Sequence, residues 1–205
     1  MQATILRTKK GRLYLLFLTI AGALLVLAPF LAWLYYDVEC ENGGFLSNVS
    51  VIVTGFGSLT TSNPIIGVTY VFPPLQGWWY GDLTMIVGAL VVVDSLLVLY
   101  RPETAGLIAF LLSFINIPTS LFFLGRLGEI EVMVLNFVSA IQGAGYAIVG
   151  TASGYAIGFY LEVIGTFLLP IASVFITTNA AKLKQAAEKE EDKRKKLAEQ
   201  KTLLE

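Results

Sequence analysis

The feature that most constrains this chain is the length of its apolar runs. The first run extends from Leu13 to Tyr36, 24 residues without a charged side chain. A helix needs about 20 apolar residues to cross a bilayer, whereas the apolar core of a signal peptide has about 7–15. The sequence therefore predicts an uncleaved transmembrane helix over residues 13–36. Its last aromatic residues, Trp33, Tyr35 and Tyr36, are expected at the membrane interface.

Composition also indicates a membrane protein. Of the 205 residues, 56% are hydrophobic and 14% are charged, whereas a soluble domain has about 25% charged residues. The net charge of −1 gives no basis for binding nucleic acid. The chain has no histidine, the commonest metal ligand in proteins. It has a single cysteine, Cys40, so no intrachain disulfide can form. We therefore expect no metal, haem or other cofactor.

Three further apolar runs predict three more transmembrane helices, and hence a four-helix bundle. These runs lie at residues 83–100, 105–124 and 155–179. A short turn at residues 101–104 joins the second helix to the third. A charged, helix-forming tail follows the fourth helix at residues 180–205.

Lysine and arginine are distributed unevenly along the chain. The N-terminal segment 1–12 carries Arg7, Lys9, Lys10 and Arg12, and the tail is rich in both residue types. Residues 37–82 carry acidic side chains and no Lys or Arg. By the positive-inside rule, both termini face the cytoplasm, and the loops 37–82 and 125–154 lie outside the cell. The sequence thus predicts a multi-pass protein of the cell membrane.

Both outer loops contain segments that resemble strands. Residues 48–54 and 65–72 are rich in β-branched and aromatic residues, and residues 129–137 alternate between polar and apolar. We expect a small extracellular antiparallel sheet beside an otherwise all-α membrane fold. In an alternative, residues 132–152 form a fifth span, which would place the basic tail outside, against the positive-inside rule. Asn48 begins an Asn-Val-Ser glycosylation sequon.

Small residues recur at intervals of seven on two of the predicted helices. Gly81, Gly88 and Ser95 form one stripe, and Gly158, Gly165 and Ala172 form the other. Seven residues are about two helical turns, so each set lies on one face. Small residues allow helices to approach closely in lipid. We expect these stripes to pack the bundle, with an interface between copies of the chain as the alternative.

Three polar residues lie inside the predicted spans. Asp94 is the one acid deep in an apolar run, where a charge costs at least about 2.5–3.5 kcal/mol. We therefore expect a protonated Asp94 that donates a hydrogen bond to a group such as Ser113. The alternative is a proton or cation site, in which Asn116 and Glu162 take part if a polar pocket reaches them.

The predicted plan resembles the claudin-like four-transmembrane (tetraspan) superfamily. The shared features are four spans, cytoplasmic ends, a long first outer loop rich in strands and a second outer loop that adds a strand. The small residues of the second and fourth helices, Gly81, Gly88, Gly158 and Gly165, are similar in style. The Gly-Leu-Trp motif and cysteine pair of claudins are absent, because Cys40 stands alone. The resemblance covers residues 13–179 and implies the architecture, not a barrier or a pore.

The sequence holds no nucleophile–base pair, phosphate loop or metal-binding spacing, so we expect no enzyme activity. The leading hypothesis is a structural, adhesion or membrane-organising protein that acts through its outer loops and helix faces. Its expected partners are membrane lipids and other membrane proteins or its own copies. One alternative is an accessory subunit of a larger membrane complex. The other is a small transporter or channel that uses Asp94, Asn116 and Glu162.

Overall fold

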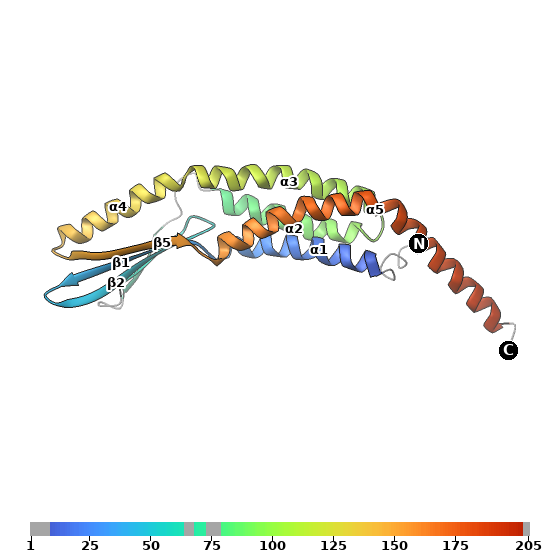
Figure 1. The fold of residues 1–205 in the computed structure, drawn as a ribbon, viewed down its shortest axis with the longest axis horizontal. Coiled ribbons are helices and arrows are strands. Elements are labelled where there is room, and N and C mark those ends of the chain that lie inside the picture. The colour runs from blue at the N-terminus through green and yellow to red at the C-terminus, as the bar shows by residue number, and fades with distance from the viewer. Residues whose placement is uncertain (1–8, 64–67, 73–78, 203–205) are drawn as a thin grey trace. The chain divides into compact units, whose positions relative to one another are not determined.

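The computed structural model describes residues 9–63, 68–72 and 79–202 (Figure 1). In chain order the elements are α1 (Lys9–Leu27), the 3-10 helix η2 (Ala28–Phe30), β1 (Ala32–Asn42), β2 (Phe45–Thr54), β3 (Leu59–Asn63), β4 (Val68–Phe72), α2 (Tyr80–Leu97), α3 (Pro102–Gly125), α4 (Leu127–Gly143), β5 (Ala147–Tyr155) and α5 (Ile157–Thr202).

The chain forms two compact units. The helical unit comprises Met1–Leu24, Val87–Ile115 and Ile164–Glu205. The sheet unit comprises Leu25–Ile86 and Asn116–Val163. Helices α1, α2, α3 and α5 contribute residues to both units.

Close approaches at small residues hold the helices of the helical unit together. Gly22 of α1 lies against α2, where a Cβ added to Gly22 would stand 2.8 Å from Val92 Cγ2. Gly106 of α3 lies against α5, where an added Cβ would stand 3.1 Å from the carbonyl oxygen of Ser173. Backbones come this close in membrane bundles because small residues leave room for them.

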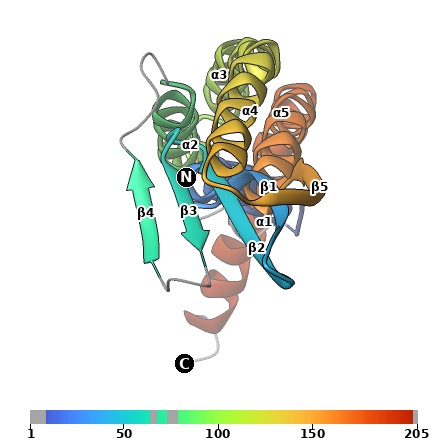
Figure 2. The same cartoon turned by 90° about the vertical axis from the view of Figure 1, so that its left-hand side faces the viewer.

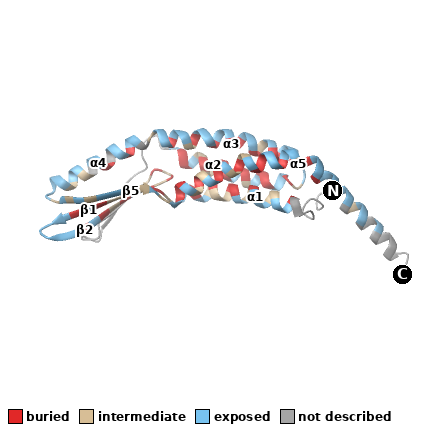
Figure 3. Ribbon diagram, viewed as in Figure 1, coloured by how far each residue is buried: buried red, intermediate tan, exposed pale blue. Residues whose placement is uncertain are grey.

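The helical unit exposes large apolar side chains on its outside, and its interior holds polar as well as apolar side chains. Figure 3 shows where the buried residues lie. Phe114 and Phe167 are 60% and 66% exposed, whereas Ser113 and Ser173 are 1% and 0% exposed. A soluble bundle instead places mainly polar and charged residues on its outer surface. This distribution favours an apolar surrounding for the helices.

In the part of the chain that the structure describes, four helices are long and apolar enough to cross a membrane, as the apolar runs predict. They lie at Gly11–Phe30, Tyr80–Leu97, Pro102–Gly143 and Ile157–Lys193, and the third stretch includes both α3 and α4. The last of these belongs to α5, a helix of 46 residues that continues from the predicted fourth span into the tail. Four such helices are typical of a multi-pass membrane protein.

The strands of the sheet unit form one antiparallel sheet in the order β4-β3-β2-β1-β5 (Figure 2). Side chains alternate along its central strands. In β2, Ser47, Val49, Val51 and Val53 are buried while the residues between them are more exposed. One face of the sheet is therefore apolar and covered, and the other is open.

Helix α4 covers the apolar face of the sheet. Its residues Ile130, Val134, Val138 and Ile141 follow helical spacing and pack against side chains of β1 and β2. The aromatic residues Trp33, Phe123 and Phe159 join this core, with the rings of Trp33 and Phe123 4.8 Å apart. Burial of these side chains is the main force that holds α4 on the sheet.

The structure corrects the predicted first helix. Helix α1 ends at Leu27, and residues 32–36 belong to β1, so Trp33, Tyr35 and Tyr36 lie on a strand. Pro29 lacks a backbone N–H and stands in η2, which ends the helix. The indole nitrogen of Trp33 then donates a hydrogen bond to the Ala28 carbonyl over 2.8 Å.

The second loop also differs from the prediction. Residues 129–137 form part of helix α4, so the predicted strand there is wrong. The apolar residues of this segment fit helical spacing as well as alternation. The segment forms a helix because its apolar stripe packs on the sheet. Residues 132–152 do not form a continuous fifth helix, since α4 ends at Gly143 and β5 follows. The strand of this loop is β5, which pairs with β1.

The strands of the first loop agree with the prediction where they are described. Residues 48–54 lie in β2, and Val68–Phe72 is β4. Residues 65–67, Trp78 and most of the basic segment 1–12 lie outside the described residues.

Candidate functional site

Two of the three predicted intramembrane polar residues lie together in the sheet unit. Glu162 of α5 is 0% exposed, and its Oε1 accepts a hydrogen bond from Asn116 Nδ2 of α3 over 3.3 Å. Ser120 Oγ, one turn further along α3, donates to the same oxygen. Two neutral donors thus hold a buried carboxyl group, an arrangement that ties α3 to α5.

Asp94 lies in the helical unit and is 3% exposed. Neither of its carboxyl oxygens has a hydrogen-bond partner among the residues that the structure describes. The predicted hydrogen bond from Asp94 to Ser113 does not form. Ser113 Oγ donates instead to the Phe110 carbonyl of its own helix. Burial of this carboxyl group is therefore a cost that the described contacts do not offset.

The residues of both small-residue stripes are buried inside the chain. A Cβ on Gly158 would stand 2.7 Å from the Ala32 carbonyl oxygen, and one on Gly81 would overlap the carbonyl group of Gly55. Ser95 accepts a hydrogen bond from Thr19 over 3.1 Å. These contacts lie within one chain, so they support internal packing of the stripes.

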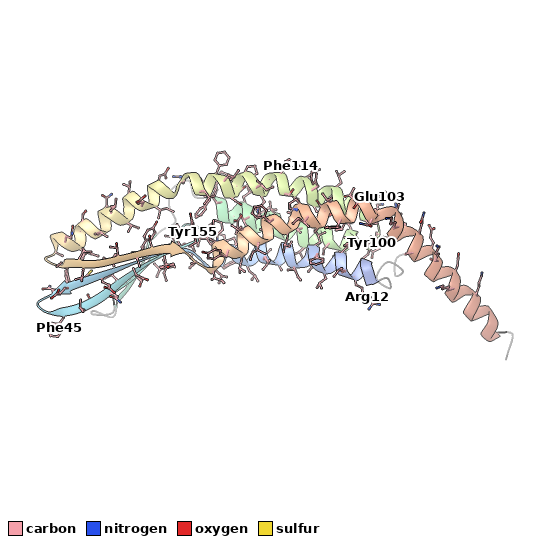
Figure 4. The ribbon with its side chains drawn as sticks, in the orientation of Figure 1. Arg12, Phe45, Tyr100, Glu103, Phe114 and Tyr155 are labelled. Carbon is pink, nitrogen blue, oxygen red and sulfur yellow. The ribbon has the colours of Figure 1, made fainter. Side chains whose placement is uncertain are left out.

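The hairpin between β1 and β2 ends in two exposed apolar residues that the sequence analysis did not single out. Gly43 and Gly44 form the turn with φ of 60° and 86°, a conformation that suits glycine. Phe45 and Leu46 follow the turn and are 79% and 71% exposed. Figure 4 shows Phe45 at the end of the hairpin. We call Gly43–Leu46 the hairpin tip. The Asn42-Gly43-Gly44 turn signal could have located it.

A pocket of about 330 Å³ opens beside the hairpin tip, between the sheet and α4. Its lining is Cys40, Ser47, Val49, Ala140, Ile141, Ala144 and Tyr146. We call it the tip pocket. Burial raises the pKa of the Cys40 thiol, so the thiol stays protonated and adds an apolar surface rather than a nucleophile.

A second pocket of about 320 Å³ lies between β1, β5 and α4. Its lining is Leu34, Tyr36, Glu131, Ser153, Gly154 and Tyr155. We call it the tyrosine pocket. Burial, and then the negative charge of Glu131, raise the pKa of Tyr36 above its ordinary value of 10.0. Two tyrosines and one acidic residue thus line one pocket.

The open face of the sheet carries the sequon. Asn48 is exposed on β2, opposite Glu39 of β1. On the same face, Ser50 donates a hydrogen bond to Asp37 over 2.6 Å. Among the described residues, no group of three or more His, Cys, Asp or Glu could hold a metal ion.

Comparison with known proteins adds no relative. No protein-family description matches the sequence, and no curated protein matches it at a significant level.

Proposed function

We propose that this chain is a multi-pass protein of the cell membrane that is not an enzyme and that joins copies of itself through the hairpin tip. In this proposal both termini face the cytoplasm and the sheet lies outside the cell. The apolar outside of the helices and the excess of Lys and Arg at the two ends of the chain support this placement. The proposed plan is similar to that of the claudin-like superfamily, with α4 as an additional helix.

The observation that carries the proposal is the exposure of Phe45 and Leu46 at the end of the hairpin. Two adjacent large apolar side chains on a turn cost free energy in water, about 0.8 kcal/mol for each exposed CH₂ group that could be buried. Loops that present apolar side chains on a rigid scaffold commonly bind partners. The antiparallel pairing of β1 with β2 supplies that scaffold.

A second copy of the chain is the partner that the geometry fits best. Along β2, Phe45 shares its side of the sheet with Ser47 and Val49, which line the tip pocket. The exposed Phe45 side chain and the tip pocket therefore lie on the same face and at the same end of the sheet. A two-fold axis can then place each Phe45 in the tip pocket of the other copy.

Acidic side chains do not oppose this pairing. Cys40 faces the tip pocket, whereas its neighbours Glu39 and Glu41 are exposed on the other face of the strand. Like charges on the two copies therefore lie away from the proposed contact.

Vesicle clustering tests the proposal. The full chain is reconstituted into two vesicle populations with different dyes, and clustering is measured by energy transfer. We expect the unchanged chain to cluster vesicles. Clustering should be lost in Phe45→Ser, which removes the exposed ring, and in Ala144→Trp, whose side chain fills the tip pocket. The matched control is Ile52→Ser, an exposed apolar residue on the open face of the sheet. The proposal is wrong if the unchanged chain does not cluster vesicles, or if Phe45→Ser clusters them equally well.

A second candidate, an accessory subunit of a larger membrane complex, rests on α5. About 20 residues suffice to cross a bilayer, and this helix has 46. Lys184 contacts Glu103 over 2.9 Å, and the helix continues from there to Thr202. Deletion of residues 186–205 would abolish binding to a cytoplasmic partner in this candidate function, but would leave vesicle clustering unchanged.

A further inference from the structure

The tyrosine pocket combines groups that suit a positively charged ligand. Its lining residues include the tyrosines Tyr36 and Tyr155, the acid Glu131 and Ser153. Lys, Arg and His are absent from its described lining. The face of an aromatic ring attracts a cation, and a carboxylate adds a full negative charge.

One wall of the pocket is held in place before any ligand binds. The ring of Tyr155 stacks on that of Phe159, with centroids 4.3 Å apart and planes inclined by 20°. Phe159 is itself 8% exposed and belongs to the core. A fixed ring loses little conformational entropy on binding, so the geometry favours recognition of a cation.

The surrounding charge favours the same class of ligand. The sheet unit has seven acidic residues and one basic residue, Arg126. Arg126 forms an ion pair with Glu129, three residues further along the chain. The ion pair therefore compensates the charge of Glu129 rather than that of Glu131. A unit of this charge attracts cations and repels anions.

The position of the pocket indicates the source of the cation. Tyr155 ends β5 two residues before α5 begins, and the exposed residues Ile157 and Tyr160 lie at the start of that helix. If α5 spans the membrane, its first turn lies near the lipid headgroups, where tyrosine is enriched. Choline and ethanolamine headgroups carry an ammonium group at this depth.

We propose that the tyrosine pocket binds the ammonium group of a zwitterionic phospholipid headgroup. Tyr36 and Tyr155 supply ring faces and Glu131 supplies the counter-charge. The Ser153 hydroxyl oxygen can accept a hydrogen bond from an ethanolamine ammonium, whereas a choline ammonium has no N–H to donate. The inference rests on the proposed membrane placement of α5, but not on the hairpin tip.

Lipid retention measured by native mass spectrometry tests the inference. The full chain, in a maltoside detergent, is offered equal amounts of phosphatidylcholine and a galactosyl diacylglycerol with the same acyl chains. The second lipid is also uncharged overall but has no ammonium group. We expect preferential retention of phosphatidylcholine, which tetramethylammonium chloride reduces and sodium chloride at equal ionic strength does not.

Matched variants locate the binding. Glu131→Gln should weaken retention roughly tenfold, and Tyr155→Leu should weaken it too, whereas Tyr155→Phe should keep it because the ring remains. The control is Glu41→Gln, which removes one exposed acid from the sheet outside the pocket. Equal retention of the two lipids, or equal effects of Glu131→Gln and Glu41→Gln, would overturn the inference. Binding of tetramethylammonium without any lipid preference would overturn the lipid source.

The hairpin-tip proposal is tested separately. Vesicle clustering that survives Glu131→Gln, together with lost lipid preference, would show that the two surfaces act independently. If the unchanged chain shows no lipid preference but still clusters vesicles, the lipid inference fails and the hairpin-tip proposal remains supported.

Discussion

Asn116 Nδ2 lies 3.3 Å from Glu162 Oε1 and joins α3 to α5 through a carboxyl group that is wholly buried. A buried acid costs free energy unless hydrogen bonds offset the loss of water. Ser120 donates a second hydrogen bond to the same oxygen. The group is best understood as a fixed connection between two helices, and its removal has a defined consequence.

Glu162→Leu should lower the free energy of unfolding by about 1–3 kcal/mol, because it removes the carboxyl oxygen that accepts from the buried Asn116 amide and from Ser120. Glu162→Gln should cost less, since its side-chain carbonyl still accepts. Unfolding in mixed micelles, followed by circular dichroism, measures both. Equal stability of Glu162→Leu and the unchanged chain would contradict this assignment.

Gly158→Ala should destabilise the sheet unit by about 1–3 kcal/mol, because its methyl group would press on the Ala32 carbonyl oxygen. The matched control is Gly128→Ala in α4, where an added Cβ meets nothing within 4 Å. That change should stabilise the helix by up to about 1 kcal/mol. Thermal unfolding of the two variants decides, and a larger loss in Gly128→Ala would contradict the packing described.

Asp94→Leu should keep or raise the stability of the helical unit, by about 1 kcal/mol or more, because it removes a buried carboxyl group without described partners. Asp94→Asn tests the transporter alternative. If reconstituted vesicles carry an ion or proton flux, Asp94→Asn should leave that flux unchanged. A flux lost in Asp94→Asn, with assembly intact, would make Asp94 an ion or proton site.

Tyr36 should make stability depend on pH in alkaline solution. Its pKa is raised by burial and by Glu131, so the folded chain holds the phenol proton more tightly than the unfolded chain does. The contribution is complete below pH 10 and is lost as the pH rises from 10 through the folded pKa. The free energy of unfolding of the unchanged chain should therefore fall, relative to Tyr36→Phe, above about pH 10. Parallel curves for the two proteins would refute this effect.

The apolar runs of the sequence predict the four long helices well, because a span depends on length and hydropathy within one segment. The end of the first helix was predicted too late. Trp33, Tyr35 and Tyr36 suit a membrane interface as well as they suit a strand, and only the pairing of β1 with β2 and β5 distinguishes the two.

The second loop shows the same limit. Residues 129–137 contain alternating and helical spacings at once, and burial against the sheet selects the helix. The sequence alone also does not predict contacts between segments that are distant in the chain. Asn116 and Glu162 were identified singly by their polarity, but their hydrogen bond requires the packing of α3 on α5.

Both pockets arise in the same way. Glu131 is an ordinary acid in the sequence, and it becomes a pocket residue because α4 places it beside Tyr36 and Tyr155. The hairpin tip is the exception, since its turn signal and its two apolar residues are adjacent in the chain. Local features are thus readable from sequence, and sites built from several elements are not.

The central claim is that the sheet lies on one side of the membrane and the charged end of α5 on the other. Labelling with a membrane-impermeant maleimide tests it most directly. In a Cys40→Ala background, single cysteines are placed at the end of β1, next to the hairpin tip (Asn42→Cys), and in α5 (Lys196→Cys), both exposed positions. In sealed right-side-out vesicles we predict labelling of Asn42→Cys at once, and of Lys196→Cys only after the membrane is opened. Labelling of both positions in sealed vesicles, or of Lys196→Cys alone, would contradict the account.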